Sequence, residues 1–112
     1  MSDDAPAKIA ARLAELWHTS RPTILERLTV LRTACAALIE NPADPKARTN
    51  GLEAAHKLSG VLGVFGLPQG SELASSIELR LKSGQPLAEP DLSTLRDRIA
   101  DLDAVIASKP DR

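Results

Sequence analysis

Hydrophobic residues recur at helical intervals along much of this chain. The clearest stripe alternates steps of four and three residues: Ile24, Leu28, Leu31, Cys35 and Leu38. A second one lies near the C-terminus: Leu92, Leu95, Ile99, Leu102 and Ile106. A weaker one opens the chain: Ile9, Leu13 and Leu16. Such steps place the members of a stripe on one face of an α-helix, and no segment shows the period of two that a half-buried strand requires.

Proline indicates where these helices begin and end, because it breaks helix interiors but is tolerated in the first turn. The eight prolines all fall between periodic segments: Pro6, Pro22, Pro42, Pro45, Pro68, Pro86, Pro90 and Pro110. They divide the chain into five predicted helices, at residues 7–17, 21–40, 45–64, 68–82 and 90–108. We expect Ser20 and Asp44 to be the N-caps of the second and third helices, and Gly66 to close the third.

Four long amphipathic helices with short connections predict an all-α fold, an up-down-up-down four-helix bundle. The short helix at residues 7–17 is expected to lie across one end of the bundle. At 112 residues the chain is expected to be a single domain, residues 1–112, with a core large enough to fold without disulfides. It is 43% hydrophobic but only 2% aromatic, so that core must be mainly aliphatic.

Charge and cysteine content narrow the classes of function. With 14 basic and 15 acidic side chains the net charge is −1, which gives no basic surface for nucleic acid. The single cysteine, Cys35, excludes an intramolecular disulfide, and its place on an apolar stripe predicts a small buried hydrophobe. No apolar run approaches the roughly 20 residues of a membrane span, and the N-terminus carries no signal core. We therefore expect a cytoplasmic protein that binds neither membrane nor nucleic acid.

The candidate chemistry lies in residues 51–67, GLEAAHKLSGVLGVFGL, around His56. On a helix, His56, Gly60 and Gly63 share one stripe at the edge of the apolar face. Each glycine costs a helix about 1 kcal/mol relative to alanine, and clearance for a partner that approaches the imidazole is one reason to carry that cost. The alternatives remain open: glycines also mark close helix packing, and a lone histidine is usually an ordinary surface residue. His18 has no partner at ligand spacing and is interpreted as a surface residue, and no metal site is expected.

The segment AHKLSGVLGVFGL resembles the signature of the histidine-containing phosphotransfer (HPt) domain. Seven positions fit the family pattern: Ala55, His56, Leu58, Gly60, Gly63, Gly66 and Leu67. Ser59 departs from it, since lysine is commonest there, while Lys57 supplies a cation directly after the histidine.

The resemblance implies a relay that carries phosphoryl groups between aspartates of receiver domains through a phosphohistidine at His56. It implies no ATP-dependent kinase activity and no cofactor of the chain's own. The receiver domain, in a response regulator or a hybrid histidine kinase, would supply Asp, Mg²⁺ and Lys. We expect the chain to act as a monomer, with Lys57 as a second catalytic candidate and Glu78 passing His56 on the next antiparallel helix.

The expected partner surface surrounds His56 and comprises Thr49, Glu53, Ser59, Gly60, Gly63, Val64 and Glu78. Val64 is informative because it lies off the core stripe, where an exposed apolar side chain suits a contact surface. Two rival interpretations remain. The chain could be the phosphoacceptor domain of a chemotaxis-type histidine kinase, or a non-catalytic helical adaptor in which His56 is incidental.

Overall fold

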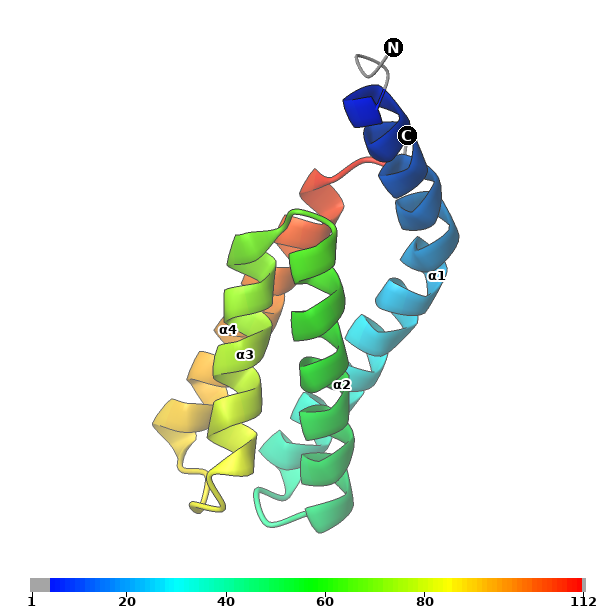
Figure 1. Cartoon of the computed structure of the whole chain (residues 1–112). Coiled ribbons are helices and arrows are strands. Elements are labelled where there is room, and N and C mark those ends of the chain that lie inside the picture. The colour runs from blue at the N-terminus through cyan, green and yellow to red at the C-terminus, as the bar shows by residue number, and fades with distance from the viewer. Residues whose placement is uncertain (1–4, 112) are drawn as a thin grey trace.

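The computed structural model of the chain describes residues 5–111. Its four helices are α1 (Ala5–Glu40), α2 (Pro45–Val64), α3 (Pro68–Lys82) and α4 (Glu89–Ser108), and no strand occurs in this range. Figure 1 shows them as an antiparallel bundle in which α1 and α3 each pack against both α2 and α4. The prediction of an all-α up-down-up-down bundle is confirmed.

The helix that carries His56 begins and ends where the sequence predicted. One carboxylate oxygen of Asp44 accepts hydrogen bonds from two backbone N–H groups of the first turn, each 3.1 Å long. At the other end Gly66 has φ +73°, a left-handed conformation that glycine adopts without steric cost. The N–H groups of Gly66 and Leu67 donate to the carbonyls of Gly63 and Leu62, the Schellman arrangement. Both ends of α2 are thus fixed by local hydrogen bonds.

The prediction of separate helices at residues 7–17 and 21–40 is wrong, because α1 is continuous for 36 residues with Pro22 inside it. Trp17 and Ile24 are both 1% exposed, and their separation of seven residues keeps them on one face only if the helix continues. Pro22 lies on the exposed side, so its ring bends the helix around the bundle and does not enter the core. Figure 1 shows α1 bowed accordingly. Ser20 is therefore a helix-interior residue and not an N-cap.

The N-terminal turns of α1 do not lie across the end of the bundle. They project beyond it, with Ile9 62% and Leu13 39% exposed, which helps to give the molecule its length of 58 Å against a width of 21 Å. Trp17 covers this end of the core: its ring meets Phe65 edge-on at 5.3 Å, and its Nε1 donates to the carbonyl of Pro110 at 3.1 Å.

The core is aliphatic, as the composition predicted. All five members of each strong stripe, from Ile24 to Leu38 and from Leu92 to Ile106, are buried. Cys35 is among them, and burial raises the pKa of its thiol, as expected for a small hydrophobe rather than a reactive group.

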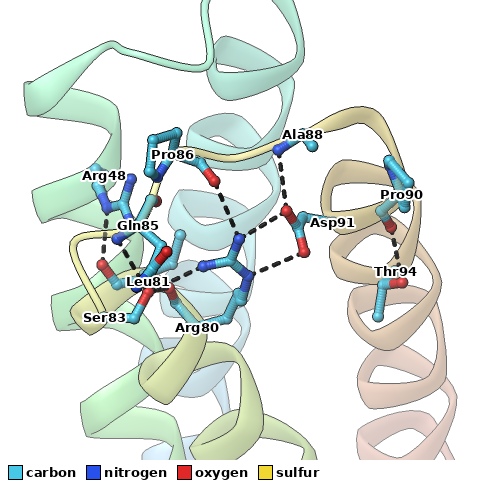
Figure 2. A network of polar contacts seen from close by, with 10 residues as sticks. All are labelled: Arg48, Arg80, Leu81, Ser83, Gln85, Pro86, Ala88, Pro90, Asp91 and Thr94. Carbon is cyan, nitrogen blue, oxygen red and sulfur yellow. Dashed lines mark hydrogen bonds and ion pairs between the residues drawn. The ribbon is translucent and has the colours of Figure 1, made fainter.

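The loop between α3 and α4 is held by arginines from two helices (Figure 2). Arg80 makes a two-pronged contact with Asp91, with Nε–Oδ1 at 3.0 Å and Nη2–Oδ2 at 2.6 Å, and also donates to the carbonyl of Pro86. Asp91 in turn accepts from the backbone N–H of Ala88 at 3.0 Å. Arg48 of α2 donates to two backbone carbonyls nearby, both at 2.8 Å. These contacts join the end of α3 to the start of α4.

The Arg80–Asp91 pair predicts a pH-dependent contribution to stability. The hydrogen bond from Arg80, aided by the N–H of Ala88, lowers the pKa of Asp91 from 3.8 to about 2. Because the folded pKa is depressed, this contribution is present above the unfolded pKa and is lost as the pH falls toward about 2. Asp91→Asn should therefore lower the melting temperature by a few degrees at pH 7, and the gap to the wild type should close between pH 4 and pH 2. Circular dichroism melts across this range measure it.

Asp97→Asn is the matched control, since Asp97 is an exposed aspartate on the same helix. Its melting temperature should follow that of the wild type at every pH. A gap for Asp91→Asn that stays constant down to pH 2 would contradict the assigned role of its charge.

Candidate functional site

His56 lies near the middle of α2 with its side chain 72% exposed. The residues that flank it on the inner face of the helix, Ala55 and Leu58, are completely buried and fix this helix on the bundle. The predicted accessibility of His56 is confirmed. Its imidazole stands out from a rigid helix rather than from a loop.

The carboxylate of Glu78, on the antiparallel α3, contacts the inner edge of this imidazole. Nδ1 of His56 and Oε2 of Glu78 are 2.7 Å apart, and the Glu78 side chain is only 21% exposed. An ionised carboxylate can only accept, so in the neutral ring Nδ1 carries the proton and Nε2 keeps its lone pair. The ring is therefore anchored on one nitrogen and has a nucleophilic atom on the other.

The two glycines beyond His56 have different surroundings. A Cβ built on Gly60 would meet nothing within 4 Å, whereas one on Gly63 would lie 3.6 Å from the hydroxyl oxygen of Ser71. Open space beside Gly60 agrees with the clearance interpretation. Gly63 lies against α3, so for this residue the alternative of close helix packing holds in part.

Most of the expected partner surface is exposed on the outer side of α2. Thr49, Glu53, Lys57 and Gly60 are all exposed, and Val64 is 66% exposed as its place off the core stripe predicted. Sequence reasoning missed Leu79 of α3, which is 68% exposed and follows Glu78 directly. The signal was available: Leu79 lies two residues from both Ile77 and Leu81, hence far around the helix from these two buried positions.

Ser59 does not belong to this exposed surface. Its hydroxyl lies 2.5 Å from the hydroxyl of Ser75, and its carbonyl accepts from Ser71 at 2.8 Å. The side chain is half-buried between α2 and α3. The structure therefore places the Ser59 hydroxyl in the contact between α2 and α3 and not among the exposed side chains around His56.

Lys57 lies on the other side of α2, toward α1. It borders a shallow groove of about 150 Å³ between these two helices, together with Arg27, Val30, Asn50, Glu53 and Ala54. His56 thus has a carboxylate on its α3 side and a lysine on its α1 side.

His18, the other histidine of the chain, lies mid-way along α1 with 48% of its side chain exposed, as expected for a surface residue. Its Nδ1 is 2.8 Å from a carboxylate oxygen of Asp111. Across residues 5–111 no three His, Cys, Asp or Glu side chains gather where they could hold a metal ion. Within the same range, none of the helices combines the length and the apolar character needed to cross a membrane.

A helical bundle that presents one anchored, accessible histidine beside a glycine has the architecture of a phosphotransfer module. The sequence model of the Hpt domain family matches residues 12–105, and the chain belongs to this family. It is also 32% identical over 95 residues to Protein RcaC of Microchaete diplosiphon. That alignment covers 82% of this chain but only 15% of RcaC. No solved structure matches the chain.

Family membership gives the chain its general role, which is phosphotransfer in a phosphorelay. Hpt domains are phosphotransfer modules rather than kinases. The resemblance inferred from residues 55–67 is confirmed, and the match extends it over most of the chain.

The contrast between the two glycines predicts a different tolerance to a larger side chain at each. Gly60→Leu should raise the free energy of unfolding by up to about 1 kcal/mol, because leucine is the better helix former and its side chain enters open space. Gly63→Leu should gain less, because its Cβ would already be in van der Waals contact with Ser71, 3.6 Å from the hydroxyl oxygen, which restricts the rest of the side chain. Urea denaturation of both variants measures the difference. A destabilised Gly60→Leu protein would show that Gly60 serves packing instead of clearance.

Proposed function

We propose that His56 takes a phosphoryl group from an aspartyl phosphate of one receiver domain and passes it to an aspartate of another. The observation that carries this proposal is the His56–Glu78 contact, which leaves Nε2 free on a ring that is 72% exposed. The match of the Hpt family model over residues 12–105, a range that includes His56, adds support.

The chemistry follows from the two ring nitrogens. The Nε2 lone pair attacks phosphorus in line, the Nε2–P bond forms, and the bond from phosphorus to the aspartyl oxygen breaks, its electron pair leaving on the carboxylate. Nδ1 keeps its proton, so the phosphorylated ring becomes a cation. The carboxylate of Glu78, 2.7 Å from Nδ1, stabilises that positive charge. Transfer to the next aspartate reverses these steps.

Charge stabilisation at phosphorus comes mainly from the partner in this proposal. The transition state of phosphoryl transfer is loose and highly charged, so catalysis is positioning plus electrostatics. The receiver domain would contribute its aspartate, Mg²⁺ and lysine, while Lys57 would add one cation from this chain. The chain would need no cofactor and no ATP-dependent kinase activity of its own.

The receiver would dock on the exposed surface around His56. Val64 and Leu79, 66% and 68% exposed, offer apolar contacts from α2 and α3, and the open space at Gly60 admits the partner's backbone. A relay must release its partner after each transfer, so a small and transient interface is expected. Gly60→Leu should accordingly suppress transfer while the bundle stays folded.

The chain contains its own control for the main test. His56→Gln should abolish acceptance of labelled phosphate from phosphorylated receiver domains, whereas His18→Gln should transfer like the wild type. Single-turnover assays with candidate receivers measure both variants. Label that persists in His56→Gln, or that disappears in His18→Gln, would assign the chemistry elsewhere.

Two other results of this assay would replace the proposal by one of its rivals. Phosphorylation of His56 by a histidine-kinase domain with ATP, without any receiver, would make the chain a kinase phosphoacceptor domain. Failure of every receiver and every kinase to label the wild type would leave a helical adaptor.

Lys57→Ala tests the contribution of that cation. If Lys57 stabilises the transition state, the transfer rate constant should fall about tenfold while the affinity for the receiver changes little. Lys46→Ala, which removes an exposed lysine from the first turn of the same helix, is the matched control and should have no effect. A rate for Lys57→Ala within about twofold of the wild type would return Lys57 to the class of solvated surface residues.

A further inference from the structure

Two polar side-chain contacts connect the antiparallel helices α2 and α3, one helical turn apart. One joins His56 to Glu78, and the other joins the hydroxyls of Ser59 and Ser75, three residues away on each helix. The serine pair is half-buried, and its oxygens are 2.5 Å apart, which requires a close approach of the two helices. Ser71 strengthens this region by donating to the carbonyl of Ser59 at 2.8 Å.

We propose that Ser59 and Ser75 are positioning residues for His56, an inference that rests on the proposed phosphotransfer function. A hydrogen bond is directional, so the serine pair fixes how far α3 stands from α2 and how it is rotated. An apolar contact of similar size would fix the distance but not the rotation. One turn away, that same distance and rotation decide whether the carboxylate of Glu78 reaches Nδ1.

Whether the neutral imidazole carries its proton on Nδ1 depends on whether the Glu78 carboxylate reaches that nitrogen. Glu78 has a long side chain with several rotatable bonds, and its carboxylate selects the Nδ1–H form of His56 only while it stays within hydrogen-bond distance. If α3 shifts, the ring loses its anchor, and the neutral form becomes a mixture of the Nδ1–H and Nε2–H tautomers. Each molecule with the proton on Nε2 then lacks the lone pair that attacks phosphorus. The serine pair therefore acts on the reaction through Glu78 and the tautomer of His56.

The decisive variant is the double substitution Ser59→Ala with Ser75→Ala. Removing both partners of a buried hydrogen bond leaves no unsatisfied group, so the bundle should fold with nearly unchanged stability. Ser76→Ala is the matched control, because the hydroxyl of Ser76 bonds to the carbonyl of Leu73 within α3. Glu78→Ala serves as the reference for complete loss of the anchor.

The first readout is the ¹⁵N spectrum of the His56 ring in the neutral form, which distinguishes Nδ1–H from Nε2–H without any partner protein. The wild type and Ser76→Ala should show the Nδ1–H form. The double variant should shift toward the mixture seen in Glu78→Ala. A double variant that folds and keeps the wild-type spectrum would overturn the inference and reduce the serine pair to packing. If the double variant fails to fold, Ser75→Ala alone is measured in the same way, with the same two outcomes.

The second readout is phosphotransfer from a phosphorylated receiver. The double variant should lower the single-turnover rate constant at saturating receiver about threefold or more, while the receiver concentration that gives half the maximal rate stays within about twofold, because the docking surface is untouched. A fall in this rate constant with an unchanged tautomer would also overturn the inference. The two proposals can fail separately. A shifted tautomer in a protein that no receiver phosphorylates would refute the proposed function alone, whereas normal transfer with an unshifted tautomer would refute only the role of the serines.

Discussion

The close packing of α2 against α3 is the contact on which the rest of the site depends. Small side chains make it possible, with Ser59 and Gly63 on α2 facing Ser75 and Ser71 on α3. Larger residues here would separate the helices, and Glu78 would no longer reach His56. The arrangement satisfies two opposing demands, since the imidazole must be open to a partner and yet held in one orientation. Anchoring one nitrogen from within the bundle leaves the other free outside it.

Support for this contact comes from both ends of α3. At its start, Gly66 turns the chain back from α2 through the hydrogen bonds of its left-handed cap. At its end, Arg80 binds Asp91 of α4 only two residues after Glu78. The arginine contacts in Figure 2 therefore hold the end of α3 that carries the anchoring carboxylate. The Arg80–Asp91 ion pair, which joins the loop between α3 and α4, therefore also limits the movement of Glu78.

Local signals in the sequence were sufficient for α2, because Asp44 and Gly66 determine its ends through short-range hydrogen bonds. They failed at Pro22, where the penalty for proline inside a helix is opposed by tertiary packing that local rules do not contain. Trp17 and Ile24 both bury their side chains on the same core, and that gain favours a bent continuous helix over a break. The helix with the weak stripe of Ile9 and Leu13 was expected to lie across one end of the bundle, because periodicity shows that an apolar face exists and not what covers it.

The same distinction between local sequence signals and tertiary packing applies to the candidate site. His56 and its exposure came from motif and periodicity, and Glu78 from the order of antiparallel helices. The Ser59–Ser75 contact requires the rotation of one helix relative to its neighbour, which no pattern within a single helix specifies.

The open space at Gly60 and the exposure of Val64 and Leu79 have a consequence for how this surface can evolve. Side chains that the fold does not use can be replaced without loss of stability, so mutation can explore them freely. The residues that orient the imidazole are half-buried between α2 and α3 and are constrained by packing. Recognition of a new signalling partner can therefore arise by drift of the exposed residues, while the half-buried ones preserve the reactivity of the histidine.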